Sequence, residues 1–273
     1  RYGLIKPKRT PKGHRLYSEA NIEEIRQIVS WLNRGVAIGK VAALLTAAEA
    51  PTQVPLNEDT WLDLQQEIMS CLIELKQRSL NPILDKLNKE MPFVSLCEKV
   101  YQPLVHQLKA RWQDKPLGYQ LEQQLWQQCW HRQMTVMALR ADKRKARGHC
   151  WLVNIDIPDT TLDYWLFYGL LIQAGIRIHA VNQLDDLDTL PRLRKSLDQP
   201  IIVFGDTKIA PREINQLVKT KALCREGTIV IGRLADIHQD AFVSMAIDHV
   251  GGDASTCWQS VNYQAWLERL SSR

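Results

Sequence analysis

The start of this sequence combines dense positive charge with a complete lack of acids. Six basic residues lie within the first seventeen positions: Arg1, Lys6, Lys8, Arg9, Lys12 and Arg15. The net charge of the whole chain is only +5, so the basic character belongs to this end and the remainder is close to neutral. Clustered Lys and Arg side chains bind phosphate groups, and a nucleic acid is therefore the expected partner.

Three aspartates farther along the chain follow short β-rich runs. Asp156, Asp159 and Asp206 occupy places where a phospho-acceptor or a metal site would lie in a flavodoxin-like fold. Asp is also a favoured helix-cap and loop residue, and no suitably placed lysine follows a fifth strand, as a phospho-receiver module would need. We therefore interpret these aspartates as structural, and we expect no catalytic residue and no metal site.

The cysteines show neither a metal-binding nor a disulfide pattern. All six are separated by twenty residues or more, without a C-x-x-C pair. Buried, reduced thiols are the expected state. No apolar run approaches the length of a membrane span, and the basic start lacks the apolar segment of a secretory signal, so the sequence predicts a cytoplasmic protein.

The basic residues need a scaffold, and the local sequence predicts one. Pro7 and Pro11 exclude a helix and Lys12-Gly13 is a turn signal, so Leu4-Ile5 and Leu16-Tyr17 are expected to flank a two-stranded ribbon with a basic tip. Such a ribbon needs support from another element. The helix predicted from Ser18 to Gly35 supplies it, and a second short helix follows from Ile38 to Thr46.

The rest of the chain predicts two further domains. Apolar residues recur at helical spacing in four stretches with short connections, which indicates a four-helix bundle. Four short β-rich runs then alternate with helical stretches, which is typical of a flavodoxin-like parallel sheet. The predicted strands are Cys150–Ile155, Ile176–Val181, Ile201–Phe204 and Thr228–Ile231, and the helical stretches between them are Leu162–Ala174, Leu184–Leu197 and Pro211–Lys221. A further helix is expected from Ala241 to Val250. The predicted fold class is multidomain α and α/β. The expected boundaries are a DNA-binding head at 1–48, a linker at 49–59, the bundle at 60–140, the α/β domain at 148–250 and a helical tail at 251–273.

The N-terminal segment carries a specific series of residues: Arg1-Tyr2-Gly3-Leu4, Pro7, Arg9-Thr10, Gly13 to Ser18 and the Gly35 to Val41 segment. In order and spacing this series resembles the wing and following helices of MerR-family transcription regulators. In that family a helix-turn-helix precedes the wing, so the sequence is expected to be a fragment of a longer protein. The resemblance implies operator binding as a homodimer. The DNA-contacting residues that it implies are Arg1, Tyr2, Lys8, Arg9, Thr10, Lys12, His14, Arg15 and Tyr17.

The domain order resembles that of the cobalamin-dependent, light-sensing regulators of the CarH type, but the ligand residues differ. Those proteins carry a Trp, nine residues and Glu-His above the corrin, and this sequence has Trp112, Glu122 and Gln123 at the matching positions. Below the corrin they carry an acid-x-His-x-x-Gly motif. Thr161 replaces the histidine here and Tyr164 replaces the glycine, so the resemblance implies a degenerate pocket without a bound cofactor. We expect aromatic side chains, Trp112 together with Tyr164 or Trp165, to fill the space that a corrin would occupy.

The segment from Asn154 to Thr161 is similar to the MlrA-type branch of the same family, which has lost the corrinoid residues in the same way. That branch implies control of biofilm or matrix genes and a protein partner from cyclic-di-GMP signalling. Two alternatives remain open. One is a sensor that binds a tetrapyrrole or a nucleotide between the bundle and the sheet, and the other is an interaction module that docks a signalling enzyme.

Overall fold

The computed structural model describes residues 4–33, 36, 38–39, 41, 58–156, 162–184, 186–192, 199–224 and 227–271. The chain forms two compact units, Arg1–Tyr101 and Gln102–Arg273. The boundary falls inside the stretch that the sequence assigns to the bundle. Among the described residues, no helix combines the length and apolarity needed to span a bilayer.

The N-terminal ribbon consists of β1 (Lys8–Arg9) and β2 (Arg15–Leu16), which pair antiparallel. The predicted ribbon is confirmed, but Leu4 and Ile5 are not part of its ladder. They pack instead against a small core formed by Ile28, Val36 and Val41, where their apolar side chains are partly removed from water.

The helix after the ribbon, α1 (Glu19–Asn33), begins where the sequence predicts. Ser18 caps it: its Oγ accepts a hydrogen bond from the Asn21 backbone N–H at 3.3 Å, and the Asn21 Oδ1 accepts one from the Ser18 N–H at 3.3 Å. The apolar stripe of α1 is only partly buried, since Ile22 and Val29 are exposed at 42% and 46%.

The helices of the first unit continue with α3 (Glu58–Ile73), α4 (Gln77–Glu90), α5 (Phe93–Leu96) and a π-helical turn η1 (Cys97–Tyr101). The first of these starts two residues before the predicted start of the bundle at residue 60. The π turn has a local cause: Pro103 has no N–H to donate to the carbonyl of Lys99 four residues earlier. The side-chain amide of Gln65 donates to that carbonyl at 2.9 Å instead.

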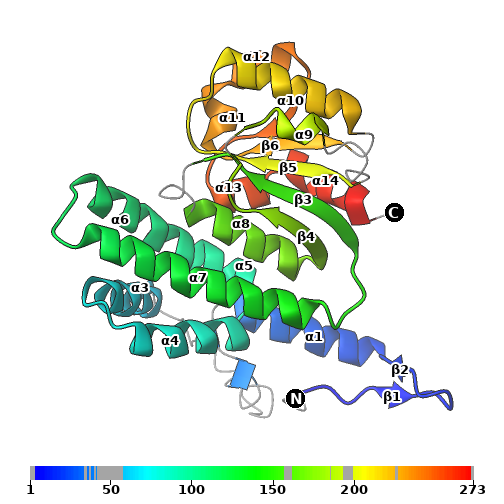
Figure 1. Ribbon diagram of the computed structural model, residues 1–273. Helices are drawn as coiled ribbons and strands as arrows, with labels where there is room; N and C mark the ends of the chain where they lie inside the picture. Colours follow the sequence, from blue (N-terminus) through cyan, green and yellow to red (C-terminus); the bar gives the residue numbers. More distant parts are fainter. Residues whose placement is uncertain are drawn as a thin grey trace. The chain divides into compact units, whose positions relative to one another are not determined.

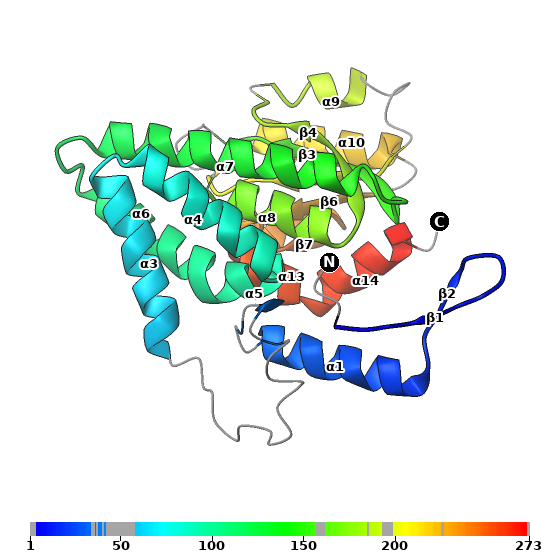
Figure 2. The same ribbon diagram turned by 90° about the horizontal axis from the view of Figure 1, so that it is seen from below.

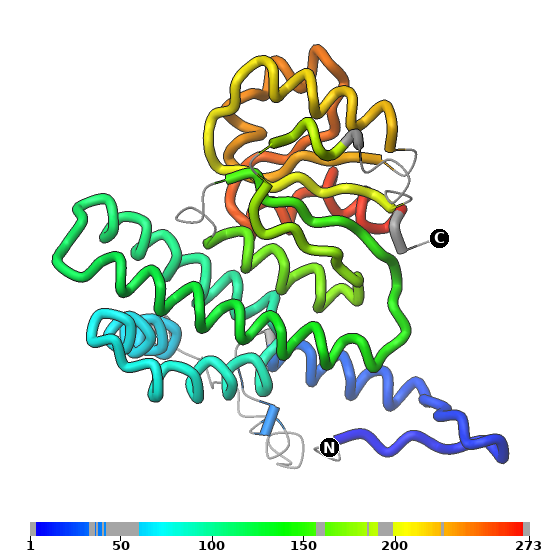
Figure 3. The backbone as a smooth tube through the Cα atoms, viewed as in Figure 1, coloured from blue at the N-terminus to red at the C-terminus, as the bar shows by residue number. Residues whose placement is uncertain are grey.

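The second unit opens with α6 (Gln102–Gln113) and α7 (Tyr119–Ala141). Gly118 precedes α7 with a φ of +86°, a conformation that glycine adopts without strain. The helix α8 (Leu162–Gln173) packs along α7 and also contacts α6 (Figures 1 and 3). The fourth predicted helical stretch is therefore bound directly to the α/β domain.

The sheet of the second unit has five parallel strands in the order β4-β3-β5-β6-β7. Their bounds are Gly148–Asn154 (β3), Ile176–Val181 (β4), Ile201–Phe204 (β5), Thr228–Ile231 (β6) and Asp248–Val250 (β7). The four predicted strands are confirmed. β5 and β6 are buried at every position, as expected for central strands of a parallel sheet.

The prediction of a helix from Ala241 to Val250 is wrong. The chain there forms α12 (Gln239–Ser244) and then the edge strand β7, in register with β6 from Ile229 opposite Asp248. The positive φ of 52° at Ala246 ends the helical path and redirects the chain. Three residues are too few for the period-2 pattern of a strand to be recognised in the sequence.

Helices cover both faces of the sheet (Figures 1 and 2). One face carries α8, α13 (Ala254–Gln259) and α14 (Val261–Ser271). The opposite face carries α9 (Thr189–Arg192), α10 (Pro211–Leu223), α11 (Arg233–Ile237) and α12. The sequence predicts a helical stretch from Leu184 to Leu197. Within it the structure describes the four residues of α9 as helical, and residues 185 and 193–197 lie outside the described residues. The core beneath the second layer includes Val203, Leu217, Val230 and Phe242.

Candidate functional site

The tip of the N-terminal ribbon is a tight loop organised by Thr10. Its backbone N–H donates to the carbonyl of His14 at 2.8 Å, and its carbonyl accepts from the N–H of Gly13 at 2.8 Å. Its hydroxyl accepts from the N–H of His14 at 3.0 Å. Gly13 has a φ of +82°, so the turn needs a residue that tolerates the left-handed region. Thr10 thus has a structural role in addition to any contact with DNA.

The predicted DNA-contacting cations surround this loop. Lys8, Arg9, Lys12 and Arg15 are all exposed, and none of them forms an ion pair with an acid in the part of the chain that the structure describes. Arg9 lies directly opposite Arg15 in the ladder. Like charges at facing positions repel and destabilise a ribbon unless an anion lies near both.

Among the remaining predicted contacts, His14 and Tyr17 are exposed, the latter at 47%. Arg1 and Tyr2 lie outside the described residues. The ribbon and the residues beside it thus expose several cationic side chains and the phenol of Tyr17. Such groups are better suited to hydrogen bonds with DNA phosphates than to recognition of base edges.

The carboxyl edge of the parallel sheet carries buried acids. Asp156, after β3, accepts hydrogen bonds from the backbone N–H groups of Asp206 and Thr207 and from the Thr207 hydroxyl at 2.6 Å. This carboxylate holds together the loops that follow β3 and β5, so its predicted structural role is supported by its contacts. Asp159 lies outside the described residues.

Lys109 of α6 forms the most concentrated charge cluster at that edge. Its ammonium contacts the Asp163 carboxylate and lies 2.8 Å from Asp206 Oδ2. The Gln102 amide donates to Asp163 Oδ1 at 2.5 Å, and the Arg233 N–H donates to Asp206 Oδ1 at 3.2 Å. The two carboxylates are only 2% and 5% exposed, so a single cation from a helix compensates both of them.

The charges in this cluster perturb one another. Burial alone would lower the pKa of Lys109, but Asp163 and Asp206 raise it on balance, so the ammonium stays protonated. Burial, with a contribution from the Asp163 charge, raises the pKa of Asp206 against the opposing effect of Lys109. The pKa of Asp206 therefore stays above that of a free aspartate even with the lysine present, and it would rise further without Lys109.

Glu122 and Trp112, both predicted as remnants of a corrin pocket, are bound to each other. Arg111 donates to both carboxylate oxygens of Glu122, at 2.9 and 2.8 Å, and the Trp112 indole N–H donates at 2.9 Å. The hydrogen bonds from Arg111 hold the pKa of Glu122 below its usual range. These residues join α6 to α7 as a structural clasp, while the neighbouring Gln123 is half-buried.

Aromatic rings fill the space between α8 and the strand ends. Tyr164 is fully buried, donates to Asn182 Oδ1 at 3.1 Å and lies edge-on to Phe204 with ring centres 5.9 Å apart. Trp165 meets the His131 ring of α7 edge-on at 5.7 Å. The prediction that Tyr164 or Trp165 occupies this region is supported by these contacts. Trp112 points instead to Glu122.

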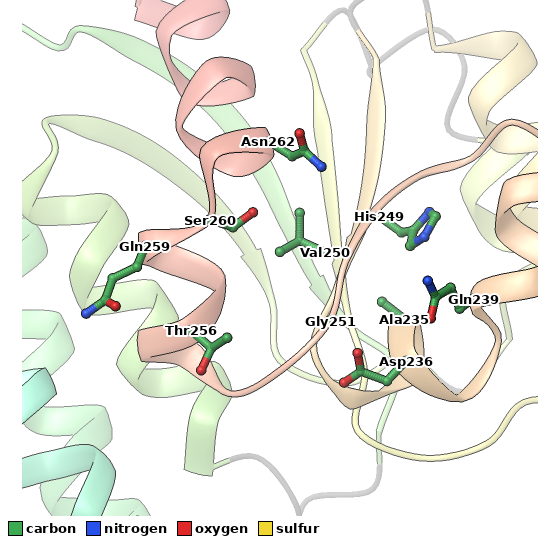
Figure 4. A pocket seen from close by; sticks show the side chains of 10 residues that line it. All are labelled: Ala235, Asp236, Gln239, His249, Val250, Gly251, Thr256, Gln259, Ser260 and Asn262. Atoms are coloured by element: carbon green, nitrogen blue, oxygen red, sulfur yellow. The ribbon is translucent and has the colours of Figure 1, made fainter.

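Two cavities adjoin these elements. One, of about 310 Å³, lies between α7 and the start of α8 and is lined by Tyr164, Trp165 and a set of amides. The other, of about 470 Å³, lies beside β7 and is shown in Figure 4. A Cβ added to Gly251 would lie 1.7 Å from Asp236 Oδ1, so only glycine leaves room for the carboxylate. The backbone N–H of Gly252 donates to Asp236 Oδ2 at 2.8 Å. Asp236 is thus held in place as one of the residues that line this cavity.

No group of three or more metal-binding side chains is present in the described parts of the chain. All six cysteines are buried and free. Burial raises the pKa of Cys150 and of Cys257 to about 12, which keeps both thiols in the unreactive neutral form.

Comparison with known proteins identifies the family. Residues 1–48 match the family described as MerR HTH family regulatory protein. The chain is 30% identical over 189 residues to the HTH-type transcriptional regulator MlrA of Escherichia coli (strain K12), covering 67% of this chain and 73% of that protein. The chain belongs to the MerR family of transcription regulators, in the MlrA branch. It is a DNA-binding regulator.

Other relatives agree with this assignment. MlrA of Salmonella typhimurium (strain SL1344) is 32% identical over 111 residues, 41% of this chain and 44% of that protein. The HTH-type transcriptional repressor CarH of Myxococcus xanthus is 24% identical over 128 residues, 43% of this chain and 42% of that protein. Both relatives are named as transcription regulators.

The fold of the MerR-family chain is similar to that of the Methanosarcina barkeri monomethylamine corrinoid protein. The TM-score is 0.52 at 10% identity, covering 75% of this chain and 99% of the other. The likeness supports the predicted combination of a helical bundle with a cobalamin-binding-like parallel sheet, and at this identity it shows the fold alone.

Sequence reasoning missed Lys109 and Arg111, which carry the charge of the two clusters. The spacing of residues in the sequence could have identified Lys109. It lies four residues after Val105 and three before Trp112, so the three side chains share one face of α6, and Val105 and Trp112 are buried. A lysine within an apolar stripe needs a buried acid nearby. Asn182 gave no such signal, because its partner Tyr164 approaches only in the folded sheet.

Proposed function

We propose that this regulator binds the DNA backbone through the tip of its N-terminal ribbon. The repulsion between Arg9 and Arg15, which face each other in the ladder, supports this: a phosphate near both side chains would turn an unfavourable pair into a favourable site. Lys8 and Lys12 are exposed beside them. Backbone contacts of this kind set affinity and register, whereas sequence is read elsewhere.

The test measures the salt dependence of binding to a random-sequence duplex by fluorescence anisotropy. Arg9→Ala and Arg15→Ala should each weaken binding and reduce the slope of log K against log salt by about 0.9 for every phosphate that the replaced side chain neutralises. Arg26→Ala is the matched control, since Arg26 is an exposed cation of α1 that pairs with Glu23 at 3.3 Å. An unchanged slope in both ribbon variants would refute the assignment.

We also propose that the α/β domain of this regulator works without cobalamin. The observation that carries this proposal is the bond from Lys109 to Asp163 and Asp206, which closes the carboxyl edge of the sheet with a helix residue. In folds of this kind ligands bind at that edge. An entering corrin would have to break a buried ion pair, which costs several kcal/mol.

The surrounding residues also fit a corrinoid poorly. Tyr164 and Phe204 fill the interior beside the strand ends with two rings, where the resemblance implies small residues along a nucleotide tail. The matching position for the axial histidine is Thr161 in the sequence, and a hydroxyl is a poor substitute for the imidazole nitrogen. We therefore assign no part of the regulatory mechanism to a bound corrinoid.

Adenosylcobalamin added in the dark tests this directly, with the visible spectrum and the melting temperature as readouts. A ligand at 100 times its dissociation constant would stabilise the protein by about 2.7 kcal/mol, so binding could not be overlooked. We expect neither a spectral change nor a shift. An upward shift that illumination reverses would show that the domain still binds cobalamin.

The MlrA branch supports two finer proposals. The regulator acts as a homodimer on its operator, which analytical ultracentrifugation of the 31.5 kDa chain would test. It controls biofilm or matrix genes, which transcript profiling of a deletion strain would test, and unchanged matrix transcripts would contradict that target. A cyclic-di-GMP signalling protein as partner rests on the same resemblance alone.

A further inference from the structure

We propose that the 310 Å³ cavity between α7 and α8 binds an uncharged, planar nitrogen heterocycle of the size of a nucleobase. Three elements line it: one face of α7, the first turn of α8 and the segment after β4. It therefore lies at the carboxyl edge of the sheet, where α/β domains bind ligands. The lining residues are Gln124, Gln127, Gln128, His131, Tyr164, Trp165, Asn182 and Gln183.

The floor of this cavity is aromatic and fixed in place. Tyr164 and Trp165 are buried, with ring centres 5.2 Å apart, and Tyr164 is tied to Asn182. The His131 ring meets Trp165 edge-on. Rigid rings offer contact to any flat π system at little entropic cost, and stacking of a base on an aromatic side chain contributes strongly to binding.

The walls carry amides that match the edge of a heterocycle. Gln124 and Gln128 are four residues apart on one face of α7, and their side-chain amides form no hydrogen bond with the described residues. The Oδ1 of Asn182 is occupied by the Tyr164 hydroxyl, which leaves its NH₂ group as a donor. An amide offers a donor and an acceptor side by side, the pattern that pairs with the ring nitrogens and exocyclic groups of a purine.

Charge and size narrow the ligand class. The eight lining residues that the structure describes include no Asp, Glu, Lys or Arg, so a phosphate or carboxylate on the ligand would gain no ion pair from them and would lose hydration. A volume of about 310 Å³ is at the lower end for small-molecule sites. It has room for one or two fused rings, and a corrin macrocycle with its side chains is far larger.

A bound ring would join α7 to the start of α8. Since α6 and α7 carry the Lys109 and Glu122 clusters, a ligand that stabilises the packing of α7 on α8 would stabilise this whole joint. The site would then serve as the effector site of the regulator. This inference rests on the proposed function in one respect only, namely that no corrinoid fills the same edge of the sheet.

The experiment titrates the full chain with adenosine, guanosine and cytidine by isothermal calorimetry and follows the melting temperature. At least one of them should bind saturably with a dissociation constant below about 1 mM and raise the melting temperature. Adenosine 5′-monophosphate should bind no more tightly than adenosine. Absence of saturable binding for all three nucleosides would overturn the proposal.

Variants separate this site from the rest of the surface. Gln128→Leu should weaken binding by about tenfold through loss of an amide contact, and Trp165→Leu by about fivefold or more through loss of stacking. Gln120→Leu is the matched control, because Gln120 is an exposed residue of α7 that does not line the cavity. Equal affinity in Gln128→Leu and Gln120→Leu would show that the nucleoside binds elsewhere and would overturn the assignment.

A competition arm separates the two proposals. Adenosylcobalamin added in the dark to the nucleoside complex should leave the bound nucleoside in place. If it displaces the nucleoside, the cobalamin-free proposal fails and the assignment of the cavity as a nucleoside effector site fails with it, although nucleoside binding itself has been measured. If neither compound binds, the nucleoside site fails while the cobalamin-free proposal stands.

Discussion

Replacement of Lys109 by methionine removes the only cation that contacts both Asp163 and Asp206 among the described residues. Loss of one partner from a buried ion pair typically costs about 3–5 kcal/mol. Hydrogen bonds from Gln102 and Arg233 would still reach the two carboxylates, so we expect the lower end, about 3 kcal/mol at pH 7.5.

The pH dependence of this loss has a defined sign. Burial, together with the Asp163 charge, already raises the pKa of Asp206 above its unfolded value, and loss of Lys109 raises it further. A group with a raised pKa stabilises the fold below the unfolded pKa and loses that contribution as pH rises through the folded pKa. The deficit of Lys109→Met relative to the wild type should therefore shrink between pH 7.5 and pH 5 as the carboxyl takes up a proton.

Urea unfolding followed by circular dichroism at the two pH values measures this loss. Lys99→Met is the control, because Lys99 is an exposed cation paired with its neighbour Glu98, and we expect a change within about 0.5 kcal/mol. Asp163→Asn and Asp206→Asn added to Lys109→Met should recover part of the stability, since no charge is then left buried. A loss below about 1 kcal/mol, or one equal at both pH values, would refute the reasoning.

Three further predictions concern other sites. Glu122→Gln should cost about 1.5–3 kcal/mol of unfolding free energy, because the charge-assisted hydrogen bonds to Arg111 are lost. Since the folded state lowers the pKa of Glu122, the stability advantage of the wild type should vanish as pH falls below about 4. A stability difference that stays constant with pH would contradict this. Gly232→Ala should cost about 2 kcal/mol or more, because φ is +96° and the Cβ would lie 2.4 Å from the Gly205 carbonyl oxygen, so an unchanged denaturation midpoint would be inconsistent. The six buried cysteines should react with a thiol reagent at pH 8 only after denaturation, and rapid reaction of the native protein would disprove their burial.

Periodicity and turn chemistry predicted most of the fold. The ribbon, the helix from Ser18, the helical stretches and four strands appear within a few residues of the expected places, because each carries its own local signal. The strand β7 lacked one, since three residues at a sheet edge are specified by pairing with β6 rather than by their own pattern. The division of the chain after Tyr101 also had no signal in composition.

The candidate site was predictable only in part. The exposed cations of the ribbon follow directly from a basic segment with a turn. The roles of Trp112 and Glu122 did not, because the sequence shows that they match a pocket motif but not that Arg111 binds the carboxylate. A buried charge pair depends on which side chains meet across elements, and that distance is fixed by tertiary packing rather than by spacing along the chain.

If the α/β domain works without cobalamin, as proposed above, Lys109 gives a physical reason why the fold could be kept without that ligand. Two carboxylates buried at the carboxyl edge of a parallel sheet need compensation, which a bound group or a side chain can supply. Here Lys109 of α6 contacts both carboxylates. Under the cobalamin-free proposal, this contact would hold α6 against the sheet in place of a corrin. The remaining space beside Tyr164 and Trp165 is then free to respond to a smaller molecule.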